Sequence, residues 1–298
     1  MSENMITYVV DSEDKLTYLR DVFKKKLPLS HALLARLKAQ EKIRVNGQVA
    51  HTNYLLQTGD RITVDLDLNE TSHILPQDLP VDVIYEDIDL MVINKSAGMA
   101  VHPIKNKLEG TLANAVTYYW SQRGETRLFR PVNRLDKGTS GLVLIAKSQY
   151  AHQAMFKQQK QGMVRRCYQA LVEGVVQEEH GCIDLPIGPA RPGSAARRTV
   201  DTAGKPAVTH FEVIKRYHAF TLLGLRLETG RTHQIRVHMS HWGHPICGDS
   251  VYGQSSSYIS HQALHAGRIS FLQPRTLAPL HFEVPLPTDM LNLLARLY

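Results

Sequence analysis

Asp136 is a carboxylate on a short turn, and its surroundings suit a group that reacts. A cation, Arg134, lies two residues before it, and the small residues of 138–141 follow it. The apolar run 142–146 then predicts a buried strand. A carboxylate on a turn that leads into rigid sheet is positioned by the backbone, as an acid, base or nucleophile requires. An ordinary surface turn with an ion pair explains the same pattern equally well.

A second candidate for chemistry is Arg231, in the segment 227–238. Residues 220–227 read as a strand, and Gly230 turns the chain toward a helix for which we expect Thr232 as the N-cap and Gly243 as the stop. A guanidinium at such a junction can hold a carboxylate or a phosphate through two hydrogen bonds.

Other motifs argue against metal or cofactor chemistry. His233, His238, His241 and His244 lie close in sequence but form no His-Glu-x-x-His pattern. The glycines around 138–141 match neither a nucleophile elbow nor a dinucleotide-binding loop. We therefore expect neither a metal site nor a dinucleotide-binding loop.

Composition indicates an anionic partner and the cytoplasm. The 298 residues carry a formal net charge of +7, which favours nucleic acid as a partner. Cys167, Cys182 and Cys247 are far apart, so no disulfide framework is implied. The polar N-terminus lacks a signal pattern, and no apolar run reaches the roughly 18 residues of a membrane span. We expect a cytoplasmic protein without membrane contact.

The candidate residues after position 80 need a sheet to position them. Strand-like runs dominate there, and helical patterns are fewer, with 111–120 and 151–160 the clearest. The expected strands are 81–85, 90–94, 142–146, 168–172, 209–214 and 220–227. Because the strands are mostly consecutive, we predict an α+β domain over 81–298 with an antiparallel or mixed sheet. Residues 191–207 are predicted to be a mobile basic loop, and 71–80, with two prolines, a linker.

Residues 1–70 predict a small, separate α/β domain. Two helices are expected, the first ended by Pro28 and the second capped by Ser30. Asn46-Gly47 suits a hairpin, and 62–66 alternates as a strand. The segment 15–44 holds nine basic residues against two acidic ones, which favours an anionic partner over a merely solvated face. The candidate RNA-binding residues are Lys24, Lys25, Lys26, Arg36, Lys38 and Arg44.

Both halves of the chain resemble known families. Residues 14–66 resemble the S-four RNA-binding domain, through Leu-Ser-His-Ala-Leu-Leu, Val-Asn-Gly-Gln-Val and Gly-Asp-Arg-Ile-Thr-Val. Residues 81–298 resemble the RluA-type RNA pseudouridine synthases through ordered motifs at 94–103, 134–141, 168–174, 229–236 and 243–253. Two departures are Ser96, where proline is usual, and Asn133, where histidine often stands.

The second resemblance implies a pseudouridine synthase fold with a mixed, mostly antiparallel sheet. It also implies a cofactor-free isomerisation of uridine in RNA to pseudouridine. Asp136 matches the catalytic aspartate, as nucleophile at C1′ or as base on the ribose. By the same analogy Arg231 pairs with Asp136 and keeps it ionised. Tyr168 stacks on the flipped base.

Several alternatives stay open at this point. Tyr168 could be a core aromatic, and Arg134 could contact RNA phosphate or hold the turn. The expected partner is RNA, ribosomal (large subunit favoured) rather than transfer RNA, and the expected state is a monomer. A non-catalytic RNA-binding or ribosome-assembly protein is the alternative function. A glycoside hydrolase is disfavoured because its usual second carboxylate is not evident.

Overall fold

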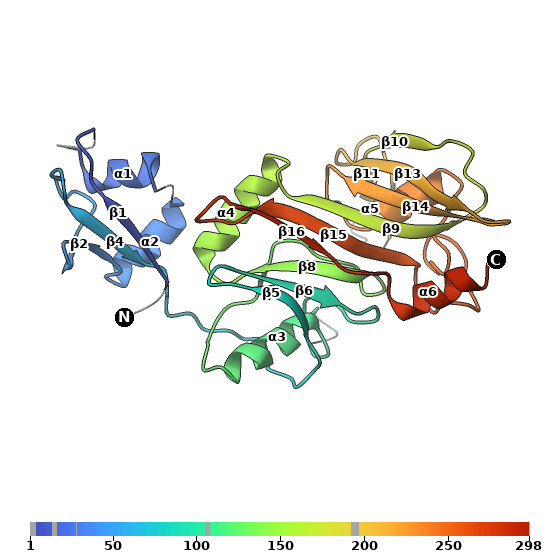
Figure 1. The fold of residues 1–298 in the computed structure, drawn as a ribbon, viewed down its shortest axis with the longest axis horizontal. Helices are drawn as coiled ribbons and strands as arrows, with labels where there is room; N and C mark the ends of the chain where they lie inside the picture. The colour runs from blue at the N-terminus through green and yellow to red at the C-terminus, as the bar shows by residue number, and fades with distance from the viewer. Residues whose placement is uncertain (1–3, 14–16, 28, 105–107, 192–196, 298) are drawn as a thin grey trace.

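The chain forms a small sheet and a large sheet in a computed structural model. The structure describes all residues except 1–3, 14–16, 28, 105–107, 192–196 and 298. One sheet of four strands is built before residue 66, and one of ten strands is built from 82–283 (Figure 1). Within the described residues, no helix combines the length and apolar character needed to cross a membrane.

The small sheet and two helices form an N-terminal unit with its own core. Its strands lie in the order β1-β4-β2-β3, and neighbours are antiparallel. The elements are β1 (Met5–Val9), α1 (Leu19–Lys25), α2 (His31–Ala39), β2 (Ile43–Val45), β3 (Gln48–Val49) and β4 (Arg61–Asp65).

The cap and turn residues of this unit have the structures that the sequence predicted. The Ser30 hydroxyl caps α2 by accepting a hydrogen bond from the Leu33 N–H. Asn46 and Gly47 both have positive φ, as a type I′ hairpin turn requires. β1 was not predicted, and the expected helix end at Pro28 lies outside the described residues.

The large sheet runs β10-β13-β14-β9-β15-β8-β6-β5, with β16 beside β15 and β7 beside β8. Its strands are β5 (Asp82–Glu86), β6 (Leu90–Lys95), β7 (Arg130–Pro131), β8 (Ser140–Ala146), β9 (Arg165–Glu173), β10 (His180–Asp184), β13 (Val208–Arg216), β14 (Phe220–Leu227), β15 (Leu264–Leu272) and β16 (Pro279–Glu283). Its helices are α3 (Leu112–Ser121), α4 (Gln149–Lys160), α5 (Gln234–His241) and α6 (Thr288–Ala295). All pairings are antiparallel except β8 with β15, so the predicted mixed, mostly antiparallel α+β sheet is confirmed.

The middle of this sheet is covered on both faces. Val143 and Ile145 of β8 pack in one core with Trp120 of α3, while Leu142 and Leu144 pack in another with Met155 of α4. A strand buried on both faces has no polar alternation, which explains the continuous apolar run of β8.

β15 is one of several strands that the sequence analysis missed, and it lies at the centre of the sheet. It joins β9 on one side to β8 on the other. At the β8 junction Gly141 has a φ of +110°, and a Cβ there would lie 2.3 Å from the Ala266 carbonyl oxygen. A residue without a side chain is therefore required at this crossing.

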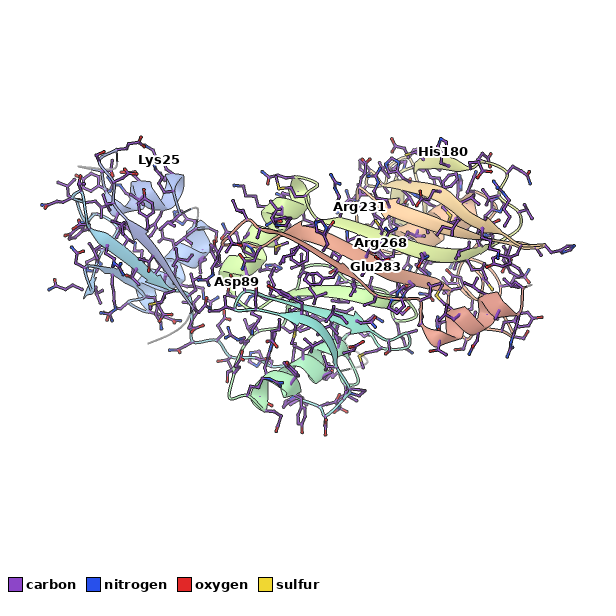
Figure 2. The ribbon with its side chains drawn as sticks, in the orientation of Figure 1. Lys25, Asp89, His180, Arg231, Arg268 and Glu283 are labelled. Carbon is purple, nitrogen blue, oxygen red and sulfur yellow. The ribbon has the colours of Figure 1, made fainter. Side chains whose placement is uncertain are left out.

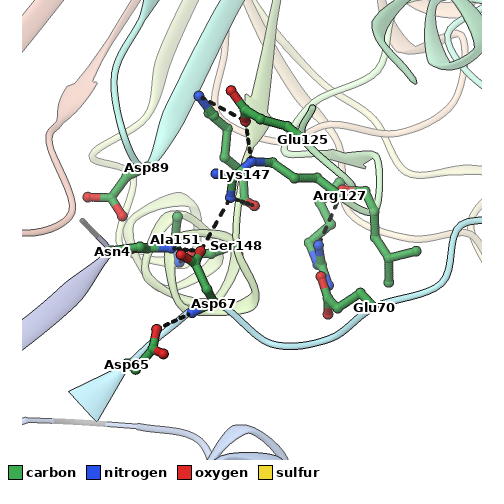
Figure 3. Close-up of polar contacts among 12 residues, drawn as sticks. Asn4, Asp65, Asp67, Glu70, Asp89, Glu125, Arg127, Lys147, Ser148 and Ala151 are labelled. Carbon is green, nitrogen blue, oxygen red and sulfur yellow. Dashed lines mark hydrogen bonds and ion pairs between the residues drawn. The ribbon is translucent and has the colours of Figure 1, made fainter. Parts of the chain in front are cut away.

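Polar contacts join the N-terminal unit to the rest of the chain (Figure 3). Glu70 forms ion pairs with Arg36 of α2, at 2.9 Å, and with Arg130 of β7. Arg275 donates to the Met5 carbonyl at 2.7 Å and to Asp89. The predicted linker, 71–80, contains no helix or strand.

The predicted mobile loop at 191–207 needs correction. Arg198–Val200 form strand β12, which pairs antiparallel with β11 (Ile187–Pro189). A backbone pairing thus orders part of this basic segment, although 192–196 lie outside the described residues.

Candidate active site

Asp136 lies in a turn that is held by a hydrogen bond of its own and by two other segments of the chain. The Thr139 N–H donates to the Asp136 carbonyl at 3.0 Å, and the Gly98 N–H donates to the Lys137 carbonyl at 2.8 Å. The Gln262 amide donates to the Thr139 hydroxyl at 3.1 Å. The turn enters β8 directly, so the carboxylate is positioned by backbone, as the sequence indicated.

The cation that pairs with Asp136 is Arg236, not Arg231. Arg236 Nη1 donates to Asp136 Oδ2 at 2.9 Å. Its Nε and Nη2 donate to the two oxygens of Asp249, at 2.7 and 2.8 Å. Burial alone would lower the pKa of Arg236, but the two carboxylates outweigh burial and raise the pKa. The guanidinium therefore stays charged, and hydrogen bonds from all three of its nitrogens fix its orientation.

The predicted pairing of Arg231 with Asp136 is wrong. Arg231 Nε donates to the Pro206 carbonyl at 2.9 Å, although the residue still lines the same cleft. The error follows from the start of α5. The N-cap is His233, in a left-handed conformation, rather than Thr232, and the helix begins at Gln234. Arg236 thereby occupies the first helical turn on the buried side.

Two further groups surround the carboxylate and were missed as site residues. His233 Nε2 lies 3.8 Å from Asp136 Oδ1, and burial lowers the pKa of His233 against the opposing effect of Asp136. Lys95 is 1% exposed, and its ammonium donates to the carbonyls of Ser96 and Met99 at 2.8 Å and of Lys137 at 3.4 Å. Burial lowers the pKa of Lys95 to about 8, with Asp136 opposing the shift. Both residues lie within the motifs at 94–103 and 229–236, but their partners are distant in sequence.

Tyr168 and Arg134 line the cleft together with Asp136. Tyr168, on β9, is 6% exposed, and it belongs to the main core as well as lining the cleft. Burial raises the pKa of its hydroxyl. Arg134 is exposed, and no hydrogen bond or ion pair within the described residues involves its side chain.

The amide side chain of Asn133 hydrogen-bonds the backbone of β8, which explains why an amide suits this position. Its side chain donates to the Leu142 carbonyl at 3.1 Å and accepts from the Leu144 N–H at 2.8 Å. The amide thus pairs with β8 as a strand backbone would, immediately before the Asp136 turn.

The candidate RNA-binding residues of the N-terminal unit fall into two groups. Lys24, Lys25, Lys38 and Arg44 are exposed, and Figure 2 shows Lys25 on this unit and Arg231 on the other. Lys26 pairs with Asp11 and Glu13, and Arg36 with Glu70 and Gln149.

The segment 15–44 is therefore less positively charged in the folded chain than a count of its own acidic and basic residues indicates. Acidic partners from outside the segment, including Asp65 for Lys42, compensate several of its cations. Among the candidates, the exposed Lys24, Lys25, Lys38 and Arg44 form no ion pair with a described residue.

The cleft around Asp136 has a volume of about 2500 Å³ and is lined by both halves of the large sheet. Among the described residues, no group of three or more His, Cys, Asp or Glu side chains is arranged to hold a metal ion. The cleft is large enough for a nucleotide with its neighbours.

Comparison with known proteins assigns the family. Residues 89–241 match the family model for RNA pseudouridylate synthase. The chain is 39% identical over 278 residues to the uncharacterized RNA pseudouridine synthase YhcT of Bacillus subtilis (strain 168), covering 93% of this chain and 92% of that protein. It is 37% identical over 283 residues to ribosomal large subunit pseudouridine synthase D of Pseudomonas aeruginosa, covering 90% and 88%.

Structural similarity agrees. Human RNA pseudouridylate synthase domain containing 1 superposes with a TM-score of 0.58 at 26% identity, over 73% of this chain and 86% of that chain. The motifs, the sheet and these relatives lead to one conclusion: this chain belongs to the RluA-type RNA pseudouridine synthase family and is an RNA pseudouridine synthase.

Proposed function

We propose that Asp136 is the catalytic carboxylate of this enzyme and that the target uridine leaves its helix to stack on Tyr168. The observation that carries the proposal is the ion pair of Asp136 with the buried, fixed Arg236 at a cleft that Tyr168 also lines. The substrate we propose is ribosomal RNA, of the large subunit.

The geometry of the carboxylate suits either chemical role left open by the sequence. The isomerisation breaks the C–N glycosidic bond, retains the uracil and rejoins it through carbon. Asp136 Oδ2 accepts from Arg236, whereas no described residue donates a hydrogen bond to Oδ1. The side chain is 25% exposed, so Oδ1 can reach the ribose to attack C1′ or to accept a proton.

Water must be kept from the reacting sugar, because hydrolysis would release free uracil. A second carboxylate that activates water is the mark of a hydrolase. Asp249, which shares Arg236 with Asp136, is fully buried and accepts two hydrogen bonds from Arg236, so it is engaged in holding that cation.

Recognition of RNA is assigned to two surfaces. Each surface carries exposed cations that can contact phosphates. The first is Arg134 at the cleft, and the second consists of Lys24, Lys25, Lys38 and Arg44 on the N-terminal unit. The preference for ribosomal RNA rests on relatives named ribosomal large subunit pseudouridine synthase D, and on the resemblance of the N-terminal unit to the S-four domain. We assign the protein as a monomer.

The decisive experiment compares Asp136→Asn with the unaltered enzyme. An amide is nearly isosteric but neither attacks carbon nor accepts a proton usefully. We expect RNA binding to persist and pseudouridine formation to stop. Mapping pseudouridine in RNA from cells with and without the protein then identifies the uridine. Normal turnover by the variant, or sites confined to transfer RNA, would overturn the corresponding part of the proposal.

A further inference from the structure

Arg166 is a buried cation without a hydrogen-bonding partner among the described residues. It is 8% exposed, and no described residue accepts a hydrogen bond from its Nε. In the described part of the chain, the buried lysine and arginine side chains are Lys95, Lys147, Arg166 and Arg236. The other three are compensated: Lys95 by carbonyls, Lys147 by Glu86 at 2.6 Å, and Arg236 by two carboxylates.

An unpaired buried charge is costly, so its position is informative. Arg166 lies on β9 two residues before Tyr168, and because side chains alternate along a strand, both face the same side. Both line the cleft with Asp136. The cation therefore faces the space that we assign to the target nucleotide.

The guanidinium of Arg166 lies close to Gly230. A Cβ at Gly230 would lie 3.1 Å from Arg166 Nη1 and 3.3 Å from Nη2. The absence of a side chain at Gly230 lets the arginine pack against this corner. The guanidinium is thus confined before any ligand arrives, which lowers the entropic cost of binding one.

We propose that Arg166 binds a phosphate of the RNA backbone next to the uridine stacked on Tyr168. A planar guanidinium suits a phosphate because it donates two parallel hydrogen bonds. RNA is the substrate, and each of its nucleotides carries a negatively charged backbone phosphate close to its base. The proposal rests on the proposed binding of the target base at Tyr168, and it adds an anion site inside the cleft to the exposed cations assigned above.

The test measures the affinity of the full-length protein for a short single-stranded RNA with one uridine, at several salt concentrations. Removing a cation that neutralises one phosphate lowers the slope of log affinity against log salt by about 0.7. For Arg166→Met we expect that decrease, with affinity roughly 10- to 100-fold weaker. The matched control is Arg165→Met, an exposed arginine one position away on the opposite side of β9, which should retain the original slope.

Folding is controlled by two measurements. Replacing an unpaired buried charge by an apolar side chain should keep or raise the Tm of Arg166→Met. Arg166→Lys keeps the charge but not the planar fork, so it should retain the salt slope and weaken binding less than Arg166→Met does.

A neutral methylphosphonate on either side of the uridine locates the contact. One of the two replacements should weaken binding to the unaltered protein and leave binding to Arg166→Met unchanged. An unchanged salt slope in Arg166→Met, an equal decrease in Arg165→Met, or equal methylphosphonate sensitivity in both proteins would overturn the proposal. Pseudouridine formation by Asp136→Asn would overturn the proposed chemistry instead and leave this binding result standing.

Discussion

The catalytic cleft and the N-terminal unit both carry positive charge, but they hold it in different ways. Arg236 and Lys95 are buried, and each is fixed by at least three hydrogen bonds. Lys24, Lys25, Lys38 and Arg44 are exposed on a unit with its own core. A buried, fixed cation orients one carboxylate, whereas exposed cations attract a polyanion without specifying its position. In the function proposed above, the fixed cations beside Asp136 serve chemistry and the exposed cations serve binding.

The largest effect is expected from Arg236→Met. Removing this cation leaves Asp249 buried without its partner, which costs about 3–5 kcal/mol of stability. Loss of the ion pair with Asp136 should lower the single-turnover rate by roughly 10²- to 10³-fold. Thermal unfolding and rapid-quench assays measure the two effects.

The matched control is Arg231→Met, because Arg231 lies five residues away but bonds to a backbone carbonyl. It should retain stability and most of the single-turnover rate. A decrease in rate equal to that of Arg236→Met in a stable protein would restore the role in chemistry predicted from the sequence.

The next effect concerns binding. Replacing Lys24, Lys25, Lys38 and Arg44 by glutamine should lower the salt slope by roughly 0.7–0.9 for each phosphate that these cations neutralise. The single-turnover rate at saturating RNA should stay unchanged, because none of these residues lies at the cleft. Binding titrations and rate measurements on the same RNA test both parts. An unchanged slope would mean that the N-terminal unit serves another partner.

Lys95 gives a pH-dependent test of the buried cation. Its pKa is lowered from 10.5 to about 8 by burial, so between these pH values the unfolded chain binds more protons than the folded one. The free energy of unfolding of the unaltered protein should therefore rise with pH across this window, relative to Lys95→Met. Urea unfolding of both proteins at several pH values measures the difference. A constant difference would show that burial does not penalise this charge.

The smallest effect is expected from Arg36→Gln. The side chain of Arg36 is 38% exposed and pairs with Glu70 between the units, so the variant should be destabilised by about 0–1 kcal/mol. The Tm and the rate of proteolysis within residues 66–81 report it. A weaker RNA affinity with unchanged stability would instead support the RNA contact predicted from the sequence.

Local signals predicted much of the fold. The Asn46-Gly47 turn, the Ser30 cap and the buried strand after Asp136 each depend on neighbouring residues, and each is confirmed. β15 was missed because His265, Arg268 and Ser270 interrupt its apolar pattern, and its burial comes from strands far away in sequence.

In the site too, local features could be predicted, whereas features that depend on distant residues could not. Asp136 and the two arginines could be found from their motifs, but the choice between Arg231 and Arg236 depends on where α5 begins. The left-handed His233 moves that start by one residue. Histidine adopts this conformation more often than most residues do, but a positive φ is still uncommon for any residue other than glycine. Arg166 was not identified because a missing partner can be recognised only in three dimensions.

The central position of β15 has a consequence for the order of assembly during synthesis. Before residues 264–272 leave the ribosome, β5, β6 and β8 can pair with each other, and so can β9, β14, β13 and β10, but no described strand joins the two groups. Asp136 belongs to the first group and Arg236 follows a strand of the second. The nascent chain therefore holds two half-sites, and the late insertion of one strand brings the carboxylate and its cation together. Under the chemistry proposed above, catalytic competence is thus delayed until nearly the whole chain has been made.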